Sequence, residues 1–130
     1  MTKLYLLLSA LGLMAAGAGY GLFPQQFLPL MMKVNLESAD TLHLLRALMG
    51  AYVGIGMFWL YTAFVEHLQK VALGSVLLFM SSVAITRIAS IWLDGKPSGL
   101  FVLYLAVELI MIVFGLLLLR SQRQRGRIFY

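Results

Sequence analysis

Four apolar segments fill most of this 130-residue chain and constrain its fold more than any other feature; they cover residues 4–23, 42–65, 71–93 and 100–119. Each is close to the roughly 20 residues that a helix needs to cross the hydrocarbon core of a bilayer. Backbone polar groups in lipid must pair within the chain, and the short alternating runs of a membrane barrel are absent, so the segments should be helices. We therefore predict an all-α fold class, an integral membrane four-helix bundle forming a single domain over residues 1–130.

The composition supports a membrane environment. Hydrophobic residues make up 62% of the chain and charged residues 12%, and the mean hydropathy is +0.92. Soluble domains carry about 25% charged residues, and a chain of this size has too little interior to bury so much apolar surface. The first segment also resembles a signal peptide, with Lys3 before it and the small residues Ala16-Gly17-Ala18 within it. It is long enough to span the bilayer, so we expect it to be retained.

The distribution of basic residues predicts the orientation. With both termini cytoplasmic, the inner side would hold Lys3, Lys70, Arg120, Arg123, Arg125 and Arg127, and the outer side only Lys33 and Lys96. The arginines of the basic C-terminal tail, residues 120–130, are expected to anchor the chain at anionic lipid, which argues against nucleic acid as a partner. We predict a multi-pass protein of the bacterial inner membrane.

The connections between the segments differ in character. Residues 24–40 form a long link whose stretch FLPLMMKVNL should lie in the membrane interface. Residues 66–70 make a tight polar link. Residues 94–99 are dense in turn formers, among them Gly95 and Pro97, and Ser98 is placed to cap the fourth helix.

Three charged residues interrupt the apolar segments at one level of the bilayer. Arg46, Arg87 and Glu108 lie on three different helices, roughly 6–12 Å from the predicted outer ends at 1.5 Å per residue. An unpaired charge in hydrocarbon costs several kcal/mol, and charges that face one another largely offset that cost. We therefore expect a buried Arg46–Glu108–Arg87 cluster.

Other polar residues should lie near this cluster at helical spacing: His43, Tyr104, Ser90 and Asp94. One glutamate against two arginines leaves an excess of positive charge, which suits an anionic or carbonyl-bearing ligand. A purely structural role stays open, because buried ion networks can fix helix register and arginines can extend to the nearby interface.

Small residues suggest where helices approach closely. Gly50 and Gly54 lie on the helix face of Arg46, and the first helix contains several pairs of small residues spaced four apart. Packing within the bundle is favoured over dimerisation, although a homo-oligomer stays open.

Signals for other chemistry are weak. No cysteine is present, so disulfides and thiol chemistry are excluded. His43 and His67 should lie on opposite sides of the membrane, which leaves no metal pair. No Ser-His-Asp set, phosphate-binding loop or dinucleotide fingerprint occurs. We predict no metal, no cofactor and no catalytic residue.

Three stretches resemble a known family: LRALMGAYVGIG, RIASIWLDGKPSG and AVELI. Between residues 42 and 119 the chain is similar to the bacterial domain-of-unknown-function 4345 family of small four-helix membrane proteins, and more distantly to the DoxX-like proteins. The resemblance implies that the family's motif positions are Arg46, Gly50, Arg87, Ser90, Asp94, Gly95, Pro97 and Glu108. It implies no activity.

The leading functional hypothesis is a protein without enzymatic activity that binds a lipid or other amphiphile in an outer-leaflet polar pocket, or that supports a partner membrane complex. Arg46 and Arg87 would take the polar head, and Glu108 would hold them in place. A small transporter or channel is an alternative, although two arginines would keep the glutamate charged and oppose proton exchange. A membrane enzyme using Glu108, His43 or Asp94 as acid or base is the third class.

Overall fold

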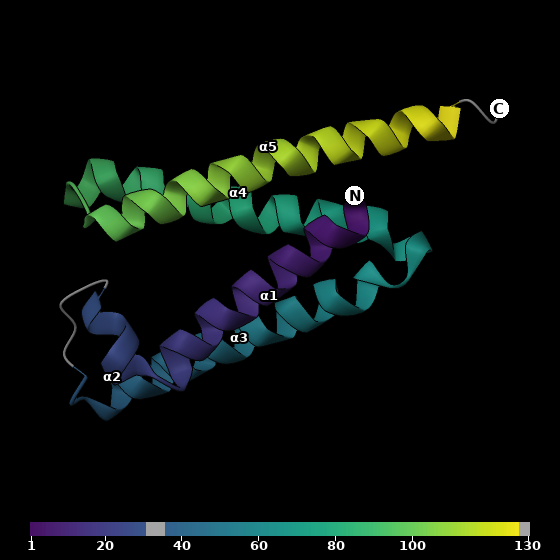
Figure 1. The fold of residues 1–130 in the computed structure, drawn as a ribbon. Helices are drawn as coiled ribbons and strands as arrows, with labels where there is room; N and C mark the ends of the chain where they lie inside the picture. The colour runs from purple at the N-terminus through teal and green to yellow at the C-terminus, as the bar shows by residue number, and fades with distance from the viewer. Residues whose placement is uncertain (31–35, 128–130) are drawn as a thin grey trace.

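The computed structural model describes the backbone of residues 1–30 and 36–127, and the side chains of residues 1–30 and 36–122. The described chain is helical throughout its regular elements (Figure 1), which are α1 (Thr2–Gly21), α2 (Pro24–Phe27), η1 (Leu28–Leu30), α3 (Ala39–Ala63), η2 (Glu66–Leu68), α4 (Gln69–Asp94) and α5 (Gly99–Arg127). Among the described residues, α1, α3, the η2–α4 stretch and α5 are long and apolar enough to cross a membrane. The prediction of an all-α protein is confirmed for the described residues, with four helices long and apolar enough to span a membrane.

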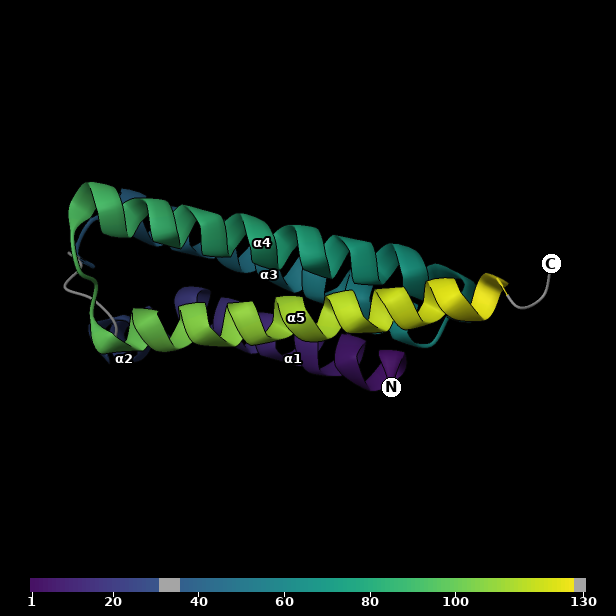
Figure 2. The same cartoon turned by 90° about the horizontal axis from the view of Figure 1, so that it is seen from above.

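The four long helices are arranged as two pairs. Helix α1 packs along α3, and α4 packs along α5, whereas contacts between the pairs are few. The pairs approach each other at the end that carries the chain termini and separate toward the end that carries α2 (Figures 1 and 2). We call the boundary between the two pairs the seam.

Glycines bring α1 and α3 together. A Cβ atom on Gly17 would lie 2.8 Å from Cβ of Tyr52, and one on Gly56 would lie 3.1 Å from the backbone oxygen of Ala10. Gly50 and Gly54 play no such part, because a Cβ atom on either would meet nothing within 4 Å. The predicted close approach at these two glycines is wrong. The reason is helical phase: Gly56 follows Gly54 by two residues, about 200° around the helix, so it faces the opposite way.

The main hydrophobic core lies toward the end that carries the chain termini. Two hydrogen bonds fasten the pairs there: Trp59 Nε1 donates to Ser75 Oγ at 2.9 Å, and the Tyr5 hydroxyl donates to the Met111 backbone oxygen at 2.8 Å. The buried members of this core are Tyr5, Leu6, Ala10, Leu13, Trp59, Ala63, Ala72, Leu73 and Val76. The pairs also meet at the α2 end, where Leu100 and Tyr104 of α5 pack against a smaller cluster formed by Tyr20 and Leu28.

Both ends of the described chain lie at the same end of the bundle (Figures 1 and 2). Gln122 Nε2 donates to Thr2 Oγ1 at 3.1 Å, which ties α5 to the start of α1. The predicted tail continues α5 as far as residue 127. Of the stretch FLPLMMKVNL, the first four residues form the end of α2 and η1, and residues 31–35 lie outside the described residues. They include Lys33 of the predicted orientation.

The turn between α4 and α5 has the conformation that its residues favour. Gly95 has φ of +92°, a region in which a side chain would be strained. Directly before α5, the Ser98 carbonyl accepts hydrogen bonds from the backbone N–H groups of Phe101 and Val102 at 3.0 and 3.4 Å. This turn sets α4 and α5 side by side in opposite directions.

Candidate functional site

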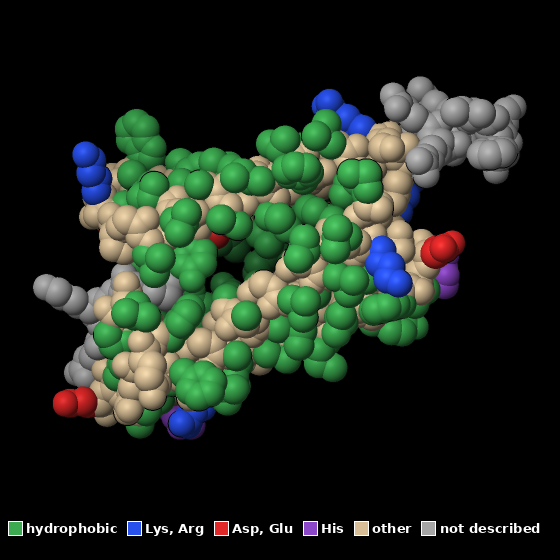
Figure 3. Space-filling model, in the orientation of Figure 1, with side chains coloured by type: hydrophobic (Ala, Val, Ile, Leu, Met, Phe, Trp, Pro, Cys, Tyr) green, Lys and Arg blue, Asp and Glu red, His purple; other side chains and the backbone are tan. Residues whose placement is uncertain are grey.

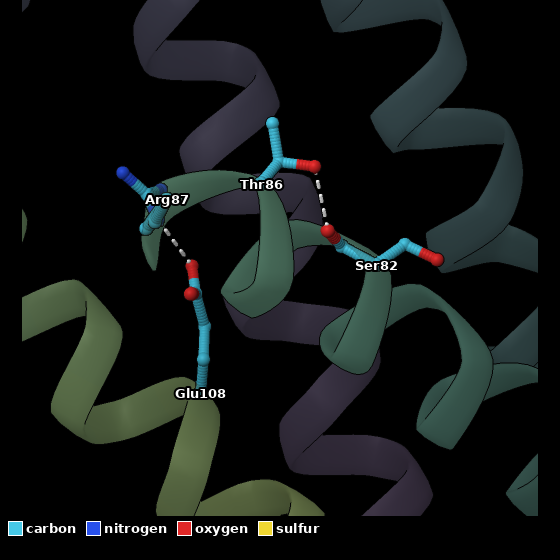
Figure 4. A network of polar contacts seen from close by, with 4 residues as sticks. All are labelled: Ser82, Thr86, Arg87 and Glu108. Carbon is cyan, nitrogen blue, oxygen red and sulfur yellow. Dashed lines mark hydrogen bonds and ion pairs between the residues drawn. The ribbon is translucent and has the colours of Figure 1, made fainter. Parts of the chain in front are cut away.

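The centre of the candidate site is an ion pair between α4 and α5. Arg87 Nε donates to Glu108 Oε1 at 2.8 Å, and Figure 4 shows the two side chains reaching toward each other. Glu108 is only 8% exposed, and the Arg87 side chain is 22% exposed. A pair this deep in a membrane helix bundle is shielded from water, so each charge depends on its partner.

The turn geometry explains why these two residues meet. Arg87 lies seven residues before the end of α4 at Asp94, and Glu108 lies nine residues after the start of α5 at Gly99. At 1.5 Å per residue, both are about 10–14 Å from the turn. Antiparallel neighbours joined by a short turn place such residues at one level.

The structure does not bring Arg46 or His43 to this pair. Both side chains are exposed on α3, and Arg46 forms no ion pair with any described residue. The expected three-residue cluster is wrong in this respect, because α3 packs against α1 rather than against α5. The buried group is one arginine with one glutamate. It carries no excess positive charge, and the sequence argument for an anionic ligand loses its basis.

Two aromatic rings of α5 flank the Arg87 guanidinium. Its central carbon lies 5.3 Å from the ring centroid of Phe101 and 5.6 Å from that of Tyr104. Cation–π attraction at these distances favours the charged arginine. Tyr104 was expected near Glu108, whereas Phe101 was missed. Its position seven residues before Glu108, on the same helix face, could have indicated it.

A chamber of about 250 Å³ adjoins the ion pair and is bounded by all four long helices. Its wall is mostly apolar, and Figure 3 shows the hollow between the two helix pairs, with acidic side-chain atoms at its edge. The polar or glycine residues of the wall that matter here are Gly12, Tyr20, Tyr52, Arg87, Tyr104 and Glu108. Polar groups are thus gathered in one part of an apolar cavity.

One oxygen of Glu108 has no partner. Oε2 is buried and accepts no hydrogen bond from any described residue, while Oε1 is held by Arg87. Buried polar atoms are paired in the great majority of cases, and an unpaired one costs about 1–3 kcal/mol. This oxygen is the least satisfied buried side-chain atom of the described structure.

A second cavity, a groove of about 530 Å³, runs between α4 and α5 toward their turn. Ser90 and Asp94, which were predicted near the charges, line this groove rather than the chamber, together with the turn residues Gly95 and Pro97. Arg87 borders both cavities. The site is therefore divided in two, with Arg87 at the boundary.

Two hydroxyl groups in the groove wall are already engaged. Thr86 Oγ1 donates to the Ser82 backbone oxygen at 2.8 Å (Figure 4). Ser82 Oγ donates to the Leu78 backbone oxygen at 2.8 Å. Such bonds to the preceding turn are usual for these residues inside helices. These hydroxyls are therefore not available to Glu108.

A row of aromatic rings crosses four elements beside the chamber. Phe27, Tyr20, Tyr52, Phe79 and Trp59 contact one another edge to face, with successive centroids 5.6, 5.8, 5.7 and 5.6 Å apart. Edge-to-face contacts of this kind add about 0.5–1.5 kcal/mol each beyond the burial of area. Tyr20, Tyr52 and Phe79 of this row also line the chamber. The row could not be predicted from the sequence, because its members are far apart along the chain.

These features define a small multi-pass helical membrane protein with a buried ion pair beside an interhelical chamber. Within the described residues, no group of three histidine, aspartate or glutamate side chains could hold a metal ion. The chain matches the family described as domain of unknown function DUF4345 over residues 1–119, and it belongs to that family. The match includes α1, beyond the 42–119 stretch on which the resemblance was based. No curated protein and no solved structure matches the chain.

Proposed function

We propose that this protein binds an amphiphilic ligand in the chamber, with the polar head at Arg87 and Glu108. The observation that carries the proposal is that Glu108, whose buried Oε2 atom has no partner in the described structure, lines a cavity of about 250 Å³. An ion pair that served only to hold α4 against α5 would be better satisfied by close packing on every side. Here Glu108 lines a cavity, and one of its two oxygens has no partner among the described residues.

The surroundings favour a ligand that is mostly apolar. The chamber lies in the seam between the helix pairs, within the length of the membrane-spanning helices, and its wall is mostly hydrophobic. Sites of this kind, apolar with a few convergent polar groups, are typical for small organic ligands. A lipid or a lipid-like molecule can reach such a seam from the bilayer.

We also propose the orientation that the basic residues favour. Lys3, Lys70 and Arg120 belong to the end that carries both termini and η2, and Lys96 belongs to the other end. An excess of basic residues favours the cytoplasmic side, so the chamber would lie in the outer leaflet of a bacterial inner membrane. A relation to the DoxX-like proteins stays a prediction, as does a partner membrane protein. No observation on the described residues favours transport or catalysis over binding.

Two glycine substitutions form a matched test. A Cβ atom on Gly12 or on Gly50 would meet nothing within 4 Å, but Gly12 borders the chamber and Gly50 borders none of the cavities described. Each change to leucine also gains a similar amount of helix propensity, up to about 1 kcal/mol. Native mass spectrometry in mild detergent should show a retained lipid-sized adduct on the wild type and on Gly50→Leu, and a strongly reduced one on Gly12→Leu. An adduct retained equally by both variants would place the ligand outside the chamber and refute the proposal.

A further inference from the structure

The hydrogen-bonding chemistry of Glu108 restricts what the ligand must offer. An ionised carboxylate only accepts hydrogen bonds. Oε1 already receives the Nε–H of Arg87, whereas Oε2 is buried and receives nothing from the described chain. The missing group is therefore a hydrogen-bond donor and not another acceptor.

The protein does not provide that donor from the surrounding wall. Tyr20, Tyr52 and Tyr104 border the same chamber, but none of their hydroxyls donates to Glu108 Oε2 in the described structure. Ser9, also in this wall, donates to the Tyr5 backbone oxygen at 2.8 Å. A molecule in the chamber can supply the donor that the described wall does not.

The charges of Arg87 and Glu108 further restrict the polar head that the ligand can carry. The Arg87–Glu108 pair is neutral as a unit, and both residues line the chamber. An anionic head would place its charge against the lone pairs of Oε2, and an ammonium head would lie close to the arginine. A neutral hydroxyl avoids both penalties, because its hydrogen can point to Oε2 and its oxygen can accept from the guanidinium, which turns a terminal nitrogen away from Glu108 (Figure 4).

Resting on the proposed function, we propose that the ligand is a neutral, hydroxyl-bearing amphiphile, such as a long-chain or cyclic alcohol, whose hydroxyl donates to Glu108 Oε2. A hydrogen bond to a charged group changes affinity by a factor of about 10 or more. Masking the hydroxyl hydrogen while keeping the apolar chain should therefore lower binding by at least that factor.

The test uses three photoreactive probes with the same twelve-carbon diazirine chain: an alcohol, its methyl ether and the corresponding carboxylic acid. Each is irradiated with the full-length protein in lipid nanodiscs, and the labelled peptides of α1 and α5 are quantified by mass spectrometry. The alcohol should label chamber residues about 10-fold more than the ether at equal concentration. It should also exceed the acid at neutral pH. Gly12→Leu should abolish chamber labelling by all three probes.

The role of Glu108 is tested by Glu108→Gln. Because the amide both donates and accepts hydrogen bonds, this variant should label only about threefold more, or less, with the alcohol than with the ether. Glu66→Gln, an exposed carboxylate at the other end of α4, should keep the wild-type preference. A preference that survives Glu108→Gln would overturn the assignment. If Glu108→Gln does not fold, the ratio of alcohol to ether labelling on the wild-type protein decides alone. A chamber in which water satisfies Oε2 would be labelled equally by the alcohol and the ether.

The outcomes separate the two proposals. Equal chamber labelling by alcohol and ether, or stronger labelling by the acid, would overturn the hydroxyl inference and leave an amphiphile site standing. Absence of chamber labelling by every probe would overturn the proposed function itself.

Discussion

The ion pair predicts which of two substitutions, Arg87→Met or Glu108→Gln, lowers the free energy of unfolding more. Glu108 is 8% exposed and has a single cationic partner, so Arg87→Met leaves a buried carboxylate with neither oxygen paired. Breaking a buried pair in this way typically costs about 3–5 kcal/mol. Glu108→Gln should be milder, at about 1–3 kcal/mol, because the amide oxygen still accepts from Nε and the arginine keeps two aromatic neighbours and partial exposure.

Reasoning from the sequence alone predicts the opposite, namely that Glu108→Gln destabilises the fold more than the loss of one arginine. If Arg46 also contacted Glu108, the loss of one arginine would leave the glutamate a second partner, and Glu108→Gln would be the worst change. In the structure Arg46 is exposed and apart from the pair. Arg46→Met should therefore change stability by no more than about 0.5 kcal/mol, as is usual for surface positions.

The measurement is the free energy of unfolding from titration with sodium dodecyl sulfate in mixed micelles, followed by tryptophan fluorescence. The double variant Arg87→Met/Glu108→Gln should recover part of the loss, with a coupling of about 1–3 kcal/mol for residues in direct contact. Additive effects would show that the two side chains do not interact. A cost for Arg46→Met equal to that for Arg87→Met would restore the three-residue cluster and refute the geometry described above.

Three further predictions concern packing and orientation. Gly17→Leu should destabilise the fold by about 1–3 kcal/mol in the same titration, because its side chain meets α3, whereas Gly50→Leu should not; equal effects would contradict the pairing of α1 with α3. Ser75→Ala removes the partner of the buried Trp59 indole and should cost about 1 kcal/mol and shift the tryptophan emission; unchanged stability and emission would count against that hydrogen bond. Reporter fusions at the C-terminus and in the link before α4 should both read cytoplasmic, and one in the turn before α5 should read external; a reversed pattern would move the chamber to the inner leaflet.

The sequence predicted the number of helices and the level of the charges for physical reasons. Four apolar runs of bilayer length require four spanning helices, because lipid offers no partner for a free backbone group. Arg87 and Glu108 belong to helices joined by a short turn, so their equal distance from it is enough to bring them together. A short turn thus makes the two helices that it joins antiparallel neighbours.

The sequence could not predict which helices pack together when no short turn connects them. The placement of Arg46 depended on whether α3 packs against α5 or against α1, and depth along the helix is the same in both cases. The glycines show the same limit, since Gly54 and Gly56 are almost adjacent in sequence and face opposite sides of one helix. Rotation about the helix axis is decided by tertiary packing, which single-residue patterns in a uniformly apolar helix do not record.

Each helix pair is held by its own contacts, and the site lies between the pairs. Helices α1 and α3 approach closely at Gly17 and Gly56, and α4 and α5 approach at Gly115, where an added Cβ atom would lie 2.8 Å from Leu77 Cδ2. The turn and the ion pair also join α4 to α5. The hydrogen bonds that join the pairs to each other lie mainly in the core toward the end that carries the termini. A ligand can therefore enter the seam near Glu108 without separating either pair. In supplying a donor to Oε2, it would also strengthen the ion pair that it touches, so binding and stability should rise together.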